Sequence, residues 1–271
     1  MTAPAPAPHH SYTSPIPVRR AHLGDALASE WTKIRSVRST MWTLGVMILL
    51  MVGVGVLTAV AIRATETDLG GESVLGLGFY GVLLGSICVV TLGVLTISSE
   101  YGTGMIRTTL TACPSRSRVV TAKALVFFLL AFVVTTVTAA LVGMVQSAMV
   151  DTAGSTGEEW LRATVGVGLF TAVLGLLALA VGALVRHSAG AITVMIGVML
   201  LPLVAGIFMS SLPKVQEVLF EYSIPSLLIA FYSDAGLSES GPHGWTPLWI
   251  LAGITAVVLA GAYAVVEKRD V

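Results

Sequence analysis

Charged side chains that could bind a partner gather in two short segments of an otherwise apolar chain. The first segment, residues 98–123, reads SSEYGTGMIRTTLTACPSRSRVVTAK and lies between two long apolar runs. Arg107 follows Glu100 by seven positions, close to two helical turns if the backbone stays helical. We expect this basic, glycine-interrupted segment to contact a cytoplasmic partner.

The local structure of that segment follows from its glycines and its proline. Gly102 and Gly104 argue against a continuous helix. Thr103 could cap a short helix over residues 104–112, which Pro114 would follow with a turn. A short helix of this kind suits the docking of a soluble domain. The alternative is an ordinary loop whose cations only set topology, and composition alone favours that alternative.

The second charged segment precedes the first apolar run and has a helical repeat. Over residues 21–40 we predict an amphipathic helix at the inner membrane surface. Its cations, Lys33, Arg35 and Arg38, lie off the apolar stripe and would face anionic lipid or a protein partner, or would only enforce topology. The apolar stripe consists of Leu23, Leu27, Trp31, Ile34 and Met41.

Catalytic and metal-binding patterns are missing from the sequence. It contains no glycine-rich phosphate loop that ends in Gly-Lys-Ser or Gly-Lys-Thr. His187 is the only histidine near an apolar run, so no Ser/His arrangement is evident. His9 and His10 lie in a proline- and alanine-rich tail, residues 1–20, which we expect to be disordered and without metal. We therefore predict a non-catalytic chain.

The elements that position these residues are membrane spans. Hydrophobic residues make up 55% of the chain and charged residues 11%, with a mean hydropathy of +0.88. None of the six apolar runs contains Asp, Glu, Lys or Arg, and each is continuous rather than alternating, which favours helices over barrel strands. The predicted fold is an all-α polytopic membrane protein with a transmembrane domain over residues 41–271. Its predicted spans are residues 41–62, 74–97, 124–150, 163–185, 189–210 and 246–266.

Positive charge is distributed unequally between alternate loops. One set of segments holds twelve of the fifteen Lys and Arg residues: the N-terminus before the first span, the segment 98–123, the turn at Arg186, and the C-terminus. The loops on the opposite side hold ten of the fifteen carboxylates. This bias predicts a multi-pass protein of the bacterial cytoplasmic membrane with both termini in the cytoplasm. Cys88 and Cys113 would then lie in the membrane or on the reducing side, so we expect no structural disulfide.

Polar and small residues inside the spans offer few clues to a cargo. Gly81 and Gly85 have the spacing of close helix contacts, either within the chain or with a second copy. Gln146 lies near a span end and could meet headgroups, and Pro202 could kink its span. The external loop over residues 211–245 contains apolar patches too short to cross a membrane, which could form short helices at the exit.

Three stretches together resemble a known family. They are SEWTKIRSVRSTMWTL before the first span, ISSEYGTGMIRTTLTACPSRSRVVTAKAL after the second, and VVEKRDV at the C-terminus. In motif order and six-span layout the chain resembles permeases of the type-2 ATP-binding-cassette (ABC) exporters, in the form common in actinobacteria. The resemblance covers nearly the whole chain except the N-terminal tail, and its first two stretches are the more specific ones.

The resemblance implies a permease subunit that forms the translocation pathway with a second permease subunit, as a homodimer or heterodimer. A separate ATPase subunit would bind ATP and Mg²⁺, so this chain would need no cofactor, and no nucleic-acid partner is expected. The missing phosphate loop agrees with this division of labour. Carried over residue by residue, the site that couples to the ATPase would comprise Glu30, Lys33, Glu100, Gly102, Thr103, Arg107, Pro114, Arg116 and Lys123.

Other functions remain open from the residues alone. An ATP-independent secondary transporter would need an ion-coupling site and usually an internal repeat, and neither is visible. An intramembrane enzyme would need a nucleophile and a base at membrane depth. A membrane scaffold or sensor is a further alternative. The sequence names no substrate, although a span region without charges fits an amphipathic cargo better than a simple ion.

Overall fold

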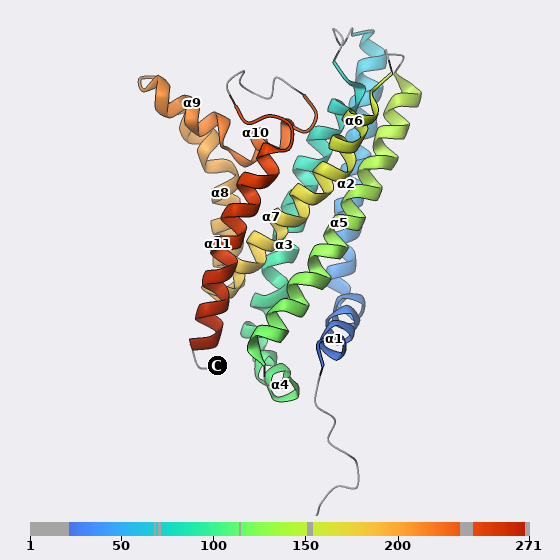
Figure 1. The fold of residues 1–271 in the computed structure, drawn as a ribbon. Coiled ribbons are helices and arrows are strands. Elements are labelled where there is room, and N and C mark those ends of the chain that lie inside the picture. The colour runs from blue at the N-terminus through green and yellow to red at the C-terminus, as the bar shows by residue number, and fades with distance from the viewer. Residues whose placement is uncertain are drawn as a thin grey trace, which may run out of the picture.

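The computed structural model describes residues 22–67, 69, 72–113, 115–150, 154–233 and 241–268. The predicted tail over residues 1–20 and the predicted turn at Pro114 lie outside the described residues. The described chain is built from helices, arranged side by side as a bundle with short helices at both ends (Figure 1). In chain order they are α1 (Leu23–Ser36), α2 (Arg38–Thr65), η1 (Val74–Gly78), α3 (Phe79–Thr103), α4 (Met105–Ala112), α5 (Arg116–Met149), α6 (Gly157–Leu161), η2 (Arg162–Gly166), α7 (Val167–Val185), α8 (Ser188–Phe208), α9 (Pro213–Glu221), α10 (Ile224–Ile229) and α11 (Thr246–Lys268).

Six candidate spans occur in the part of the chain that the structure describes. They are Arg38–Thr65, Val74–Thr103, Arg116–Met149, Gly157–Val185, Ser188–Phe208 and Thr246–Lys268. The prediction of an all-α polytopic membrane protein is therefore confirmed. Several helices continue past the apolar runs, by eight residues at the start of α5, because a helix can extend beyond the hydrocarbon core into the headgroup region.

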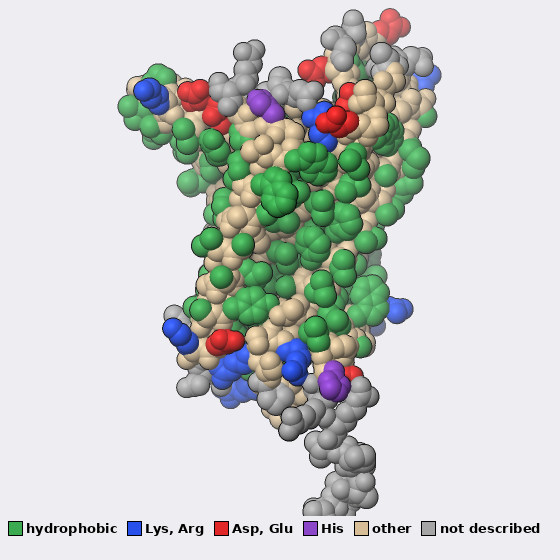
Figure 2. Space-filling view, viewed as in Figure 1, with side chains coloured by type: hydrophobic (Ala, Val, Ile, Leu, Met, Phe, Trp, Pro, Cys, Tyr) green, Lys and Arg blue, Asp and Glu red, His purple; other side chains and the backbone are tan. Residues whose placement is uncertain are grey.

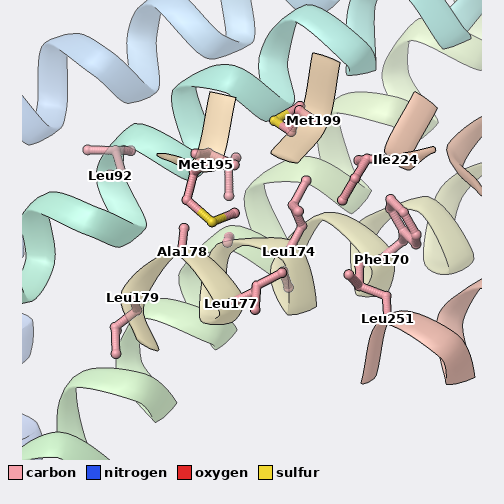
Figure 3. Close-up of a cluster of buried hydrophobic side chains, with 14 of the residues drawn as sticks. Leu92, Phe170, Leu174, Leu177, Ala178, Leu179, Met195, Met199, Ile224 and Leu251 are labelled. Atoms are coloured by element: carbon pink, nitrogen blue, oxygen red, sulfur yellow. The ribbon is translucent and has the colours of Figure 1, made fainter. Parts of the chain in front are cut away.

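The centre of the bundle is formed by α3 and α7, the two helices that bury most of their surface. α7 is apolar around its whole circumference, which suits a helix enclosed on all sides. Figure 3 shows Leu174 of α7 among side chains from several helices, including Leu92 of α3 and Met195 and Met199 of α8. α10 and α11 also contribute to this cluster, so α7 is the helix around which the others pack.

Glycines let α3 approach its neighbours closely. A Cβ atom added at Gly93 would overlap the carbonyl oxygen of Gly175 in α7 and lie 3.1 Å from the Cβ of Ala178. Cβ atoms added at Gly81 and Gly85 would instead meet Met51 of α2, at 2.7 Å from its carbonyl oxygen and 2.9 Å from its Cγ. The Gly81 and Gly85 pair therefore packs within the chain.

Charged side chains separate between the two ends of the bundle. In the view of Figure 2 most of the acidic side chains lie at the end that carries α6 and α9, and most of the basic ones lie at the end that carries α1 and α4. The predicted external loop over residues 211–245 contains two short helices, α9 and α10. A belt of hydrophobic side chains lies between the two charged ends, as expected of a protein surrounded by lipid (Figure 2).

Two predicted boundaries were wrong. The amphipathic helix ends at Ser36, because Val37 is extended, and a new helix begins at Arg38. Met41 therefore belongs to the first span and not to the amphipathic helix. Residues 98–123, predicted as a loop with one short helix over residues 104–112, are mostly helical. The short helix is present as α4, but α3 continues to Thr103 and α5 already begins at Arg116.

The close approach of α3 to α7 gives a first prediction. Gly93→Ala should lower the free energy of unfolding by about 1–3 kcal/mol, the usual cost of inserting a methyl group into a packed interior. Unfolding in mixed detergent micelles would measure it. Gly197→Ala is the matched control, because nothing lies within 4 Å of a Cβ at that helical position. Equal stability of the two variants would contradict the tight α3–α7 contact.

Candidate functional site

The short helix α4 folds back at the end of the second span because of one glycine. Gly104 has a left-handed backbone, with φ of 72°, and it separates α3 from α4. The predicted cap was wrong: the Thr103 hydroxyl donates a hydrogen bond of 2.9 Å to the carbonyl of Ser99. As the last residue of α3, Thr103 bonds to its own helix, and Gly104 takes the N-cap position of α4.

Four charged side chains from three helices form one cluster beside α4. Glu30 and Lys33 come from α1, Glu100 from α3 and Lys123 from α5. The Lys33 ammonium lies 2.8 Å from Glu30 Oε1 and 2.8 Å from Glu100 Oε1. The Lys123 ammonium lies 2.9 Å from Glu30 Oε2 and 2.6 Å from Glu100 Oε1. Each lysine thus binds both carboxylates, and we call this arrangement the charge cluster.

The charge cluster is almost entirely removed from solvent. Lys123 is 1% exposed, Glu100 2% and Glu30 4%, whereas Lys33 is half-buried. Burial by itself would lower the pKa of Lys33, but its hydrogen bonds to Glu100 and Glu30 and the attraction of both carboxylates outweigh that effect and raise the pKa. A lone buried charge would be costly, so the cluster depends on its equal number of positive and negative groups.

Two cavities border the charge cluster on different sides, and Glu30 and Lys33 line both of them. One, of about 190 Å³, lies among α1, α2, α3 and α5, and its lining includes the hydroxyls of Thr43 and Thr96. The other, of about 330 Å³, lies between α1 and α4. Lys33 also donates a hydrogen bond of 3.4 Å to Thr109 of α4. The cluster therefore stands between a cleft formed by the two short helices and a cavity formed by the spans.

The remaining predicted site residues lie elsewhere. Gly102, Thr103 and Arg107 are exposed at the end of α3 and on α4. Arg116 turns towards the last turn of α11, where its guanidinium donates to the carbonyls of Val266 and Glu267, at 3.0 and 3.4 Å. Pro114 lies outside the described residues. The structure thus brings together four of the nine residues and attaches a fifth to the C-terminal helix.

The sequence reasoning missed several contacts at the same end of the bundle. The Arg186 guanidinium lies 4.9 Å from the centre of the Tyr101 ring, a cation–π contact with α3. The hydroxyls of Ser98 and Ser188 lie 2.9 Å apart, which ties α3 to α8. His187 caps α8, since its Nδ1 accepts a hydrogen bond from the Gly190 N–H. The short turn between two spans, with its Arg186 and His187, was the available signal.

The sequence places this arrangement in a known family. A family model described as ABC-2 family transporter protein matches residues 26–201, which include the whole charge cluster. The chain belongs to the ABC-2 transporter family. It is a membrane permease of an ABC transporter, and this family implies association with an ATPase subunit. None of the curated proteins matches this ABC-2 chain.

The charge cluster gives a second prediction. Lys123→Met leaves two buried carboxylates with one lysine, so the free energy of unfolding should fall by about 3–5 kcal/mol. The double variant Lys123→Met with Glu100→Leu keeps the Glu30–Lys33 pair and should recover most of that loss. Unfolding in detergent would measure both.

Arg107→Met is the control for this pair of variants, because Arg107 is exposed and its loss should change stability by less than about 0.5 kcal/mol. The double variant could lose as much free energy of unfolding as its two single variants lose in sum. That result would contradict mutual neutralisation.

Proposed function

We propose that this chain is the permease subunit of an ATP-driven exporter of the bacterial cytoplasmic membrane. It forms the translocation pathway with a second permease subunit, and a separate ATPase subunit supplies the energy. Both termini face the cytoplasm, as does the end of the bundle that carries α1 and α4. The family match supports the permease role, and the gathering of cations at that end supports the orientation.

The observation that carries the proposal is the charge cluster. It joins α1, which lies outside the spans, to α3 and α5, which cross the membrane. Lys33 adds a contact to α4 through Thr109. A displacement of α1 would break the Lys33–Glu100 and Lys123–Glu30 contacts and leave the buried Glu100–Lys123 pair with fewer partners. Displacing α1 must therefore either move α3 and α5 or lose these buried contacts.

This linkage suggests how ATP binding is coupled to transport. The ATPase docks on α1 and α4, where Arg107 and Met105 are exposed beside the cleft of about 330 Å³. When two ATPase subunits close on ATP, they move these short helices. The charge cluster transmits the movement to the spans and shifts the balance between inward-open and outward-open states.

The direct test is to purify the chain together with a candidate nucleotide-binding ATPase subunit. Arg107→Glu should weaken this complex about tenfold, equivalent to about 1.4 kcal/mol, because it reverses a charge on the proposed docking helix. Arg63→Glu is the matched control. It makes the same change at an exposed position in the last turn of α2, at the end of the bundle away from α4. Equal losses in both variants, or none in either, would contradict docking on α4.

Glu100→Gln separates docking from coupling. Glu100 is buried, so the complex should still form, but the stimulation of ATP hydrolysis by the permease should fall at least about tenfold because one carboxylate of the cluster is neutral. ATPase assays in proteoliposomes would measure it, with the isolated ATPase as baseline. Normal stimulation with Glu100→Gln would remove the charge cluster from the coupling mechanism.

The orientation has its own test. Cysteines introduced as Ser36→Cys and Gly154→Cys lie at opposite ends of the bundle, and both positions are exposed. A membrane-impermeant maleimide should label Gly154→Cys in intact cells and Ser36→Cys only after permeabilisation. The unmodified chain, with Cys88 and Cys113, sets the background. The reverse labelling pattern would overturn the proposed orientation.

A further inference from the structure

A face of α1 away from the charge cluster forms an apolar groove with the outer surface of α5. The groove has a volume of about 530 Å³. Both walls carry only apolar side chains: Leu27, Ala28 and Trp31 on α1, and Leu125, Val126, Leu129, Leu130 and Val133 on α5. None of the four charge-cluster residues lines it, and it has no part in the ATPase coupling proposed above.

The α5 wall faces away from the core of the bundle. Leu125, Leu129 and Val133 recur every four residues along a membrane span and are 41%, 50% and 52% exposed. The groove is therefore open on the side of the bundle where lipid lies. Water gains nothing in an apolar cavity, because it needs polar groups to bind. The groove thus suits an apolar occupant that reaches it from the membrane.

A cation continues the groove-lining face of α1. Arg35 follows Trp31 by four positions on α1, so the two side chains lie on the same face of the helix. Arg38, the first residue of α2, is also exposed. Neither arginine has an ion pair within the described residues. An anionic group beside this face of α1 would be attracted by the Arg35 guanidinium.

We propose that the groove holds one acyl chain of an anionic phospholipid, with the headgroup phosphate against Arg35. The apolar walls accept the chain, and Arg35 selects the negative headgroup. A second copy of the protein is the less favourable occupant. In a two-fold contact across this groove, the Arg35 side chains of both copies would come to one interface and repel one another.

Such a lipid would hold α1 on a different face from the one that carries the charge cluster. Glu30 and Lys33 attach one face of α1 to α3 and α5, while Leu27, Ala28 and Trp31 on another face would rest on the acyl chain. The lipid therefore fills a space between an interfacial helix and a span that no side chain of the described chain occupies.

Native mass spectrometry of the full-length chain in detergent tests the proposal, with phosphatidylglycerol and phosphatidylcholine as added lipids. The unmodified chain should retain one phosphatidylglycerol. Arg35→Gln should weaken retention about fivefold, the effect expected of removing one cation near an anionic headgroup. Ala28→Phe should weaken it at least as much, because the ring occupies the groove. Ala28 is exposed, so this substitution leaves the core unchanged.

Two controls match these variants. Val137→Phe adds bulk to an exposed position of α5 outside the groove, and Arg107→Gln removes a cation from α4. Both should retain phosphatidylglycerol like the unmodified chain. Equal retention by all variants would overturn the proposal, and so would equal retention of phosphatidylcholine.

A second measurement locates the chain. Phospholipids brominated on the acyl chain should quench more fluorescence in the unmodified protein than in Trp31→Phe, because Trp31 lines the groove. Equal quenching would place the lipid elsewhere. Cross-linking of Leu129→Cys between two copies, with both native cysteines replaced, would show that a second copy covers the groove and would overturn the lipid assignment.

Discussion

Mutual neutralisation of two lysines and two glutamates is the constraint on which this end of the molecule depends. Three of these side chains are nearly without solvent contact, so each charge must keep its partners. The backbone breaks next to the cluster meet that requirement. The extended Val37 lets α1 run separately from the first span, and the left-handed Gly104 lets α4 turn back beside Lys33. Helices without these breaks would carry the same charges into lipid or into water.

The charge cluster is connected to the packed helices of the bundle because α3 belongs to both. Towards one end, α3 carries Glu100 in the cluster. In its middle, Gly93 brings its backbone against α7 with no space for a methyl group. Closely packed helices transmit displacement rather than absorb it. In the coupling proposed above, a movement of Glu100 would pass along α3 to α7, around which α8 and α11 are packed.

The spans could be predicted from the sequence because each is a long apolar run, a property of neighbouring residues. The charge cluster could not be predicted in this way, because its ion pairs join residues that are separated by 67 and by 93 positions in the sequence. One sequence does not show which lysine contacts which glutamate. Family resemblance named Glu30, Lys33, Glu100 and Lys123 but not their contacts. It equally named Arg116, which binds α11 instead. Thr103 was predicted wrongly because a threonine in a last helical turn can bond to its own helix as readily as it can cap the next.

The position of α1 is determined by forces of two different kinds on two of its faces. On one, Lys33 and Glu30 make hydrogen-bonded ion pairs, which require a defined geometry. On the other, Leu27 and Trp31 border an apolar groove, where contact with an acyl chain is adaptable and depends on the surrounding membrane. A helix held in this way can move together with α3 and α5 through its ion pairs, while its apolar face shifts its position against the lipid. That asymmetry fits the role proposed for α1, which is to follow the ATPase while it remains seated in the membrane.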